Sequence, residues 1–292
     1  MSAIESLASF IILIKPGIVA AVLLAGFAGM VLAARGLPDI QTCLICLASL
    51  FLAASGSALI NGVLDARMDL RMERLKARVA AMGKAGQGRV LTTALTGICL
   101  ALFLACRFLG PLAFLLILVA VLTYTLLYTL CLKRYSPWGT VTGGVPGALP
   151  VLIGYAATAH SLGLDSIILF TVMLLWQPPH FWSLALEHRR DYLSADVPVL
   201  SVTHGERYAG LLILLYASAL LPASLSLWLF GFCSTWYAVC ALLSGVAYLG
   251  ACYHYIFRSR RFSMAFTASI LYLIFLFTAI VGDICFIQRG MQ

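Results

Sequence analysis

The stretch Asn61–Lys76, NGVLDARMDLRMERLK, gathers three acidic and four basic side chains in a chain that is 62% hydrophobic and 10% charged. Asn61, Asp65 and Asp69 recur at every fourth position, so on a helix they form one stripe that drifts by about 40° per step. An amide and two carboxylates suit Mg²⁺, which completes its shell with water and substrate phosphate. We therefore expect a magnesium and diphosphate site around which the apolar segments fold. The alternative is a solvated helix end at a membrane surface.

The composition predicts an integral membrane protein. With 292 residues and a mean hydropathy of +1.02, the chain has too few polar side chains to cover a soluble globule. We expect an all-α protein with nine transmembrane helices in a bundle around a central cavity that opens to the cytoplasmic side, and a single domain over residues 1–292. Apolar runs of about 20 residues, long enough to cross a bilayer, fall at 10–33, 40–62, 91–109, 111–132, 139–159, 165–186, 209–230, 235–256 and 264–286.

The distribution of basic residues predicts the orientation of the chain. If alternate loops share one side, 16 of the 19 Lys and Arg lie on the side of the N-terminus, and only Arg35, Arg107 and Arg289 lie on the other. Cytoplasmic loops carry such an excess, so we expect a cytoplasmic N-terminus and an outside C-terminus. The net charge of +8 is then explained by topology and by anionic lipid or phosphate, without nucleic acid.

Two polar segments, about 65–89 and 187–207, lie on this cytoplasmic side and are four spans apart. We expect them to face each other over one site. One straight helix cannot turn both the acidic stripe and the following bases toward the same phosphate. Either the helix ends near Leu70–Glu73 and Arg74, Lys76 and Arg78 fold back over the site, or these bases face lipid headgroups.

Two further motifs carry candidate residues. In Trp176–Trp182, WQPPHFW, two prolines predict a broken helix, because backbone groups in the membrane must be satisfied internally. His180 could ligate a metal or porphyrin iron, carry a proton, or bond a carbonyl freed by the prolines. Asp191, in the second polar segment, is the acid best placed to hold a second metal ion. Tyr128–Arg134, YTLCLKR, lies on the same side as the stripe, but taken alone it is better explained as an interfacial anchor.

These motifs together resemble the UbiA superfamily of intramembrane prenyltransferases, and within it the branch that farnesylates heme. The resemblance runs over nearly the whole chain. It is carried by Lys15-Pro16-Gly17, NGVLDARMD, YTLCLKR, LWQPPHFW and DYLSADVPVL. The chain departs from the family pattern at Leu75 and Ala77, where Thr and Asn are usual.

The resemblance implies transfer of a farnesyl group from farnesyl diphosphate to a vinyl group of heme B, giving heme O and diphosphate. Mg²⁺ would be the cofactor and heme B a substrate. The expected partners are the lipid bilayer, a bacterial inner membrane, and a downstream heme A synthase or terminal oxidase. The rival hypotheses are a prenyltransferase acting on a quinone-precursor ring and, from another class, an intramembrane ion or metal transporter.

The resemblance also implies roles for individual residues. Asn61, Asp65 and Asp69 would hold Mg²⁺ diphosphate, with Asp191 supporting a second ion. His180 would lie near the heme. The remaining candidates are three bases that neutralise the leaving diphosphate, Lys133, Arg74 and Arg78, and two substrate-binding residues, Tyr128 and Arg134.

Overall fold

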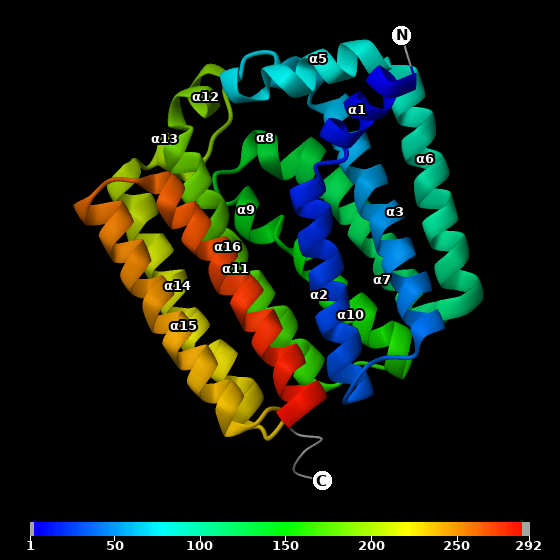
Figure 1. Ribbon diagram of the computed structural model, residues 1–292. Helices are drawn as coiled ribbons and strands as arrows, with labels where there is room; N and C mark the ends of the chain where they lie inside the picture. The colour runs from blue at the N-terminus through cyan, green and yellow to red at the C-terminus, as the bar shows by residue number, and fades with distance from the viewer. Residues whose placement is uncertain (1–2, 288–292) are drawn as a thin grey trace.

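The computed structural model describes residues 3–287, and this part of the chain is helical and contains no strand. The long helices run roughly side by side, and a group of short helices lies across one end of them (Figure 1). The long helices are α2 (Pro16–Ala34), α3 (Ile40–Leu64), α6 (Gln87–Leu104), α7 (Pro111–Leu122), α10 (Val145–Ala159), α11 (Leu164–Glu187), α14 (Glu206–Leu229), α15 (Thr235–Tyr253) and α16 (Phe262–Gly282). The short ones are α1 (Ala3–Leu13), α4 (Ala66–Asp69), α5 (Lys76–Ala85), α8 (Lys133–Tyr135), α9 (Gly139–Thr142), α12 (Arg189–Ser194) and α13 (Leu200–Thr203).

Several of these helices continue as single π-helical segments or tight turns. Among the described residues, π-helical segments extend α6 over Ala105–Leu109, α7 over Thr123–Leu132, α15 over His254–Arg258 and α16 over Asp283–Ile287. A 3₁₀ turn, Glu73–Leu75, joins α4 to α5. With these extensions, eight helices in residues 3–287 are long and apolar enough to cross a membrane.

The fifth predicted span, 139–159, is present as a broken helix and is the one that these eight do not include. Its apolar part, α10, has 15 residues. The short helix α9 precedes α10, and a break at Gly143 and Gly144 separates the two. The carbonyl of Gly144 at this break accepts a hydrogen bond from Gln177 Nε2 of α11 at 2.7 Å. The same carbonyl also accepts from the backbone amides of Gly147 and Ala148 at 3.0 and 3.2 Å, so Gln177 adds a contact that ties α11 to the break.

The first predicted span, 10–33, began too early. The chain turns at Lys15, which adopts a left-handed conformation with φ 57° before Pro16, and α2 begins only there. Residues 10–13 belong to α1, which packs on α5 across the polar end. The physical reason is that a residue before proline is disfavoured in the α-helical region, so hydropathy alone misses the boundary.

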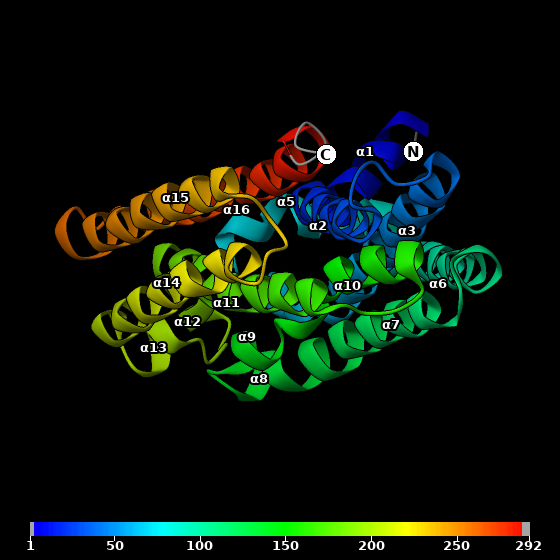
Figure 2. The same cartoon turned by 90° about the horizontal axis from the view of Figure 1, so that it is seen from below.

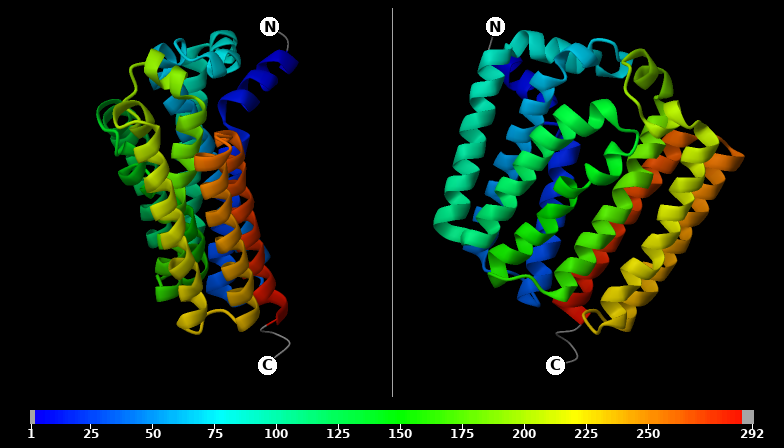
Figure 3. Two further views of the ribbon diagram at one scale, coloured as in Figure 1. Left: turned by 90° about the vertical axis from the view of Figure 1, so that its left-hand side faces the viewer. Right: turned by 180° about the vertical axis from the view of Figure 1, so that it is seen from behind.

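The long helices form two layers. Seen along the bundle, α15, α16, α2 and α3 lie in one row and α14, α11, α10 and α7 in the other (Figure 2). The edge view shows the same layers, with α1 slanting away at one end (Figure 3). The layers pack most closely where α2 crosses α10, since a Cβ on Gly154 would lie 1.9 Å from the carbonyl oxygen of Gly26.

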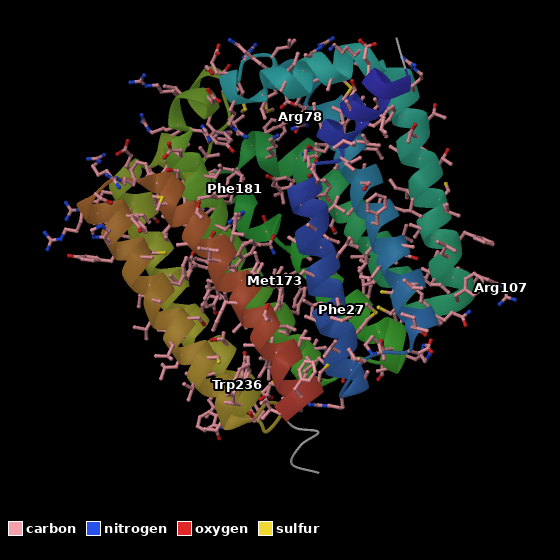
Figure 4. The ribbon with its side chains drawn as sticks, in the orientation of Figure 1. Phe27, Arg78, Arg107, Met173, Phe181 and Trp236 are labelled. Atoms are coloured by element: carbon pink, nitrogen blue, oxygen red, sulfur yellow. The ribbon has the colours of Figure 1, made fainter. Side chains whose placement is uncertain are left out.

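The two polar segments meet at one end of the bundle, as predicted. Arg71 pairs with Asp196 at 2.8 Å, and Ser194 Oγ donates to the carbonyl of Arg71 at 2.7 Å. Arg107 projects from the outer edge of α6, away from these segments (Figure 4). Helix α1 and the C-terminal end of α16 lie at opposite ends of the bundle, which fits an odd number of crossings (Figure 1). Arg289 lies outside the described residues.

The close crossing of α2 and α10 predicts a stability effect. Gly154→Ala should lower the free energy of unfolding by about 1–3 kcal/mol or more, because the added methyl group meets backbone, which cannot rotate away. The control is Gly83→Ala in α5, where a Cβ has nothing within 4 Å. Thermal unfolding in detergent would measure both, and equal transition temperatures for the two variants would contradict the prediction.

Candidate active site

The acidic stripe is buried at the polar end of the bundle. Asn61, Asp65 and Asp69 have exposed fractions of 2%, 0% and 2%. Helix α3 ends at Leu64, yet the Asp65 amide still donates to the Asn61 carbonyl and the Asp69 amide to the Asp65 carbonyl, each at 2.9 Å. Because these i to i−4 bonds continue through the break, the three side chains stay on one stripe.

Basic side chains from two elements surround the stripe. Lys133, in α8 at the end of the fourth span, forms an ion pair with Asp65 Oδ2. Arg78, in α5, approaches Asp69 Oδ2 at 3.1 Å and Asn61 Oδ1 at 3.3 Å, and it lies beneath α5 at the polar end of the bundle (Figure 4). Arg134 donates to the carbonyl of Leu64 at 3.0 Å, with Nη2 4.0 Å from Asp65 Oδ1. Buried carboxylates are tolerated only when they are paired in this way.

Lys15 is a cation of this site that we did not assign from the sequence. Its Nζ donates to Asn61 Oδ1 at 2.5 Å. Burial, together with the nearby charges of Arg78 and Lys133, lowers the pKa of Lys15 to about 7. The available signal was a single charged residue between two apolar stretches, directly before a proline, but nothing in the sequence says that it reaches α3.

Four buried polar atoms of the site have no hydrogen-bond partner among the described residues. They are two acceptors, Asp65 Oδ1 and Asp69 Oδ1, and two donors, Arg78 Nε and Arg134 Nε. Burial raises the pKa of Asp69, although Arg78 and Lys133 oppose the shift. Buried polar groups are nearly always bonded. Carboxylate oxygens and guanidinium nitrogens left over together fit a ligand with both a cation and an anion.

The second polar segment supplies Asp191, which contacts Arg74 rather than the stripe. Asp191 Oδ2 accepts from the backbone amide of Arg74 at 3.1 Å, and Arg74 Nη2 donates to the Tyr192 hydroxyl at 3.1 Å. Burial raises the pKa of Tyr192. No group of three or more His, Cys, Asp or Glu side chains in residues 3–287 forms a metal cluster. A second metal at Asp191 therefore stays a prediction.

The basic residues that follow the stripe were predicted either to fold back over the site or to face lipid headgroups, and they do not all behave alike. Arg74 and Arg78 fold back to the site through the turn that ends at α5. Lys76 instead is largely exposed and pairs with Glu73. Helix α3 ends at Leu64, six residues before the predicted Leu70–Glu73 limit, but α4 continues to Asp69, and the chain turns toward α5 after it.

His180 lies in a continuous helix, so the predicted break at the two prolines is wrong. Helix α11 runs through Pro178 and Pro179 to Glu187. The His180 ring stacks between Trp176 and Phe266, with centroid distances of 4.4 Å to each. Its Nδ1 lies 2.6 Å from Ser269 Oγ, so it bonds a hydroxyl on α16 and not a carbonyl freed by proline.

Tyr128 belongs to the π-helical segment that leads to Lys133. It stacks on Tyr124 with a centroid distance of 5.8 Å, and a Cβ on Gly143 would collide with its ring. One residue on, Thr129 Oγ1 accepts from Asn61 Nδ2 at 3.1 Å. This segment therefore joins the acidic stripe to the break before α10.

Comparison with known proteins identifies the family of this chain. Residues 22–281 match the model of the UbiA prenyltransferase family. The chain belongs to this family. It is therefore an integral membrane prenyltransferase, and the transporter hypothesis is set aside.

Relatives and solved structures agree with this membership. The chain is 52% identical over 256 residues to a protoheme IX farnesyltransferase of Geotalea uraniireducens, a match that covers 88% of this chain and 99% of the relative. Its fold is similar to that of digeranylgeranylglyceryl phosphate synthase, with a TM-score of 0.75, 18% identity, and 96% and 99% of the two chains covered. A UbiA homolog from Archaeoglobus fulgidus bound to DMAPP and Mg²⁺ superposes with a TM-score of 0.69, 13% identity, and coverage of 93% and 99%.

The buried and exposed ion pairs of this UbiA protein should differ in their effect on stability. Lys133→Met leaves the fully buried Asp65 with only the more distant Arg134, at 4.0 Å, as an ion-pair partner, and should cost about 3–5 kcal/mol. Asp196→Ala removes an exposed pair and should cost less than about 1 kcal/mol. Chemical unfolding followed by tryptophan fluorescence would compare them, and equal costs would argue against a buried pair.

Proposed function

We propose that this UbiA protein transfers a farnesyl group from farnesyl diphosphate to a vinyl group of heme B, giving heme O and diphosphate. The observation that carries the proposal is the buried site in which two carboxylate oxygens and two guanidinium nitrogens lack partners. Such a site suits a metal diphosphate. The acceptor and the length of the prenyl chain come from the relative named protoheme IX farnesyltransferase, which matches over nearly its whole length.

The donor groups fit Mg²⁺. Asp65 and Asp69 each present a buried oxygen with no partner, and Mg²⁺ is usually held by one or two carboxylates together with phosphate and water. The fold neighbour from Archaeoglobus fulgidus binds this ion with a prenyl diphosphate. When bound, the ion would neutralise the diphosphate and so make it a better leaving group.

The basic side chains stabilise the charge that develops when the allylic C–O bond breaks. Lys133 and Arg78 are held on Asp65 and Asp69, so they are already oriented before the substrate arrives. Arg74, fixed by Asp191 and Tyr192, extends this positive surface toward the second polar segment. Preorganised cations of this kind need no rearrangement as the negative charge moves onto the diphosphate. Arg134 bonds the Leu64 carbonyl next to Asp65, and Tyr128 lies in the segment that leads to Lys133.

We assign binding of the acceptor, heme B, to the aromatic side chains around His180. Trp176 and Phe266 cover the two faces of the His180 ring, and Ser269 orients the ring through Nδ1. Nε2 has no hydrogen-bond partner in residues 3–287 and is left to contact the porphyrin. After the farnesyl carbon bonds to the vinyl group, a water adds to the carbon that becomes cationic, which gives a hydroxyethylfarnesyl group.

The protein would work in a bacterial inner membrane, with its N-terminus in the cytoplasm and its C-terminus outside. The basic side chains gathered around the two polar segments support this orientation. Residues 1–292 would form one catalytic domain. The product would pass to a heme A synthase or a terminal oxidase.

The reaction predicts a defined product. Purified protein in detergent with heme B, farnesyl diphosphate and Mg²⁺ should form a heme whose mass has increased by one farnesyl group and one hydroxyl group. Chelation of Mg²⁺ should abolish this product. Mass spectrometry would detect it, and farnesylation of a quinone precursor but not of heme would move the protein to the rival branch.

Two variants should separate the substrates. Asp65→Ala should reduce turnover by at least about 100-fold while heme B still binds, because it removes a metal ligand and leaves the aromatic group intact. His180→Ala should instead weaken heme binding by about tenfold or more. Heme titration followed by absorbance, run beside the product assay, would measure both. Unaltered turnover in both variants would refute the two assignments.

A further inference from the structure

Lys15 is held in an unfavourable backbone conformation. It is a non-glycine residue with φ 57° and ψ 68°, and it directly precedes a proline. L-residues rarely adopt this left-handed conformation, and they persist in it only where the surroundings demand it. Leu13, two residues earlier, is fully buried in a cluster with Met82 of α5. The packing of α1 on α5 thus fixes the chain on one side of Lys15, and α2 fixes it on the other.

This conformation turns the ammonium group of Lys15 onto Asn61. The amide oxygen of Asn61 accepts from Lys15 Nζ at 2.5 Å and from Arg78 Nη2 at 3.3 Å. The amide nitrogen donates to Asp65 Oδ2 at 2.9 Å and to Thr129 Oγ1 at 3.1 Å. A side-chain amide has two acceptor sites and two donor hydrogens. Asn61 therefore uses its full hydrogen-bonding capacity, unlike the two carboxylates beside it.

The charge balance around the stripe follows from these contacts. Asp65 is paired by Lys133 and Asp69 by Arg78, whereas the Lys15 ammonium group donates to the neutral amide of Asn61 and forms no ion pair within residues 3–287. The oxygens left for a metal are Oδ1 of Asp65 and Oδ1 of Asp69. Lys15 is thus an additional positive charge next to the metal position, and a bound diphosphate is the group of opposite charge nearest to it.

We infer that Lys15 binds the diphosphate of the prenyl substrate. Before the diphosphate arrives, the ammonium group of Lys15 repels the metal ion from the carboxylates of the stripe. The inference rests on the proposed function, because it assigns Lys15 to the same diphosphate. It gives the residue two effects of opposite sign. The ammonium group weakens binding of the metal alone and strengthens binding of the metal diphosphate, which favours joint arrival of the two.

The test compares metal and diphosphate binding in the full-length protein in detergent. Lys15→Met should bind Mn²⁺ alone about tenfold more tightly, because a positive charge close to the ion is removed. The same variant should bind magnesium pyrophosphate about tenfold more weakly, since it lacks a cation for the phosphate oxygens. Electron paramagnetic resonance of free Mn²⁺ gives the first affinity, and isothermal titration calorimetry with inorganic pyrophosphate and Mg²⁺ gives the second.

Three further variants show whether a change in either affinity comes from the lost charge of Lys15 or from damage to the backbone. Lys15→Gly removes the same charge but accepts the left-handed backbone, so it should repeat both shifts if Lys15→Met folds poorly. Lys15→Arg keeps the charge and should show much smaller shifts. Lys84→Met makes the same charge change on the exposed face of α5 and should shift neither affinity.

The outcomes separate the inference from the function beneath it. Opposite shifts in the two affinities support the inference, because damage to the fold would weaken both. Weakening of both affinities, or no change in either, overturns it while leaving the proposed function in place. Failure of the unaltered protein to bind magnesium pyrophosphate would overturn the proposed function itself.

Discussion

The buried ion pairs between the acidic stripe and the bases of α5 and α8 are the constraint on which the rest of the structure depends. Asp65 and Asp69 are almost inaccessible to solvent, and they are stable there because Lys133 and Arg78 lie against them. The desolvation of two carboxylates in a membrane protein is costly unless each has a partner. The chain must therefore bring the ends of its second and fourth spans and the helix α5 to one place.

The local structure around the stripe follows from this requirement. Helix α3 ends at Leu64, and the chain turns through α4 so that α5 returns across the bundle with Arg78 toward Asn61. Helix α1 packs on α5 and so supports Arg78 and Lys15 together. The tight crossing of α2 and α10 at Gly26 and Gly154 holds the two layers below the site. Rigid scaffolding of this kind keeps the charged groups in place before the substrate binds, which is what electrostatic catalysis requires.

The active-site half near the stripe was more predictable than the half near His180. Asn61, Asp65 and Asp69 share a period that any helix preserves, so their convergence follows from local geometry. His180 follows two prolines, and its neighbour across the helix interface, Ser269, is 89 residues away. The prolines predicted a broken helix, whereas α11 runs through both of them. Lys15 was missed for a similar reason, because its contact with Asn61 spans 46 residues.

The sequence by itself determined the membrane class, the limits of most spans, the helical stripe of ligands and, through its motifs, the resemblance to the prenyltransferase family. Those features depend on hydropathy and on helix period, which are properties of short segments. Only the tertiary structure decided which base pairs with which acid, that Lys76 stays at the surface while Arg78 is buried, and that Asp191 holds Arg74. These pairings depend on the turns at Lys15, Leu64 and Gly86. Turns of this kind are set by packing between distant helices, and the local sequence carries no record of that packing.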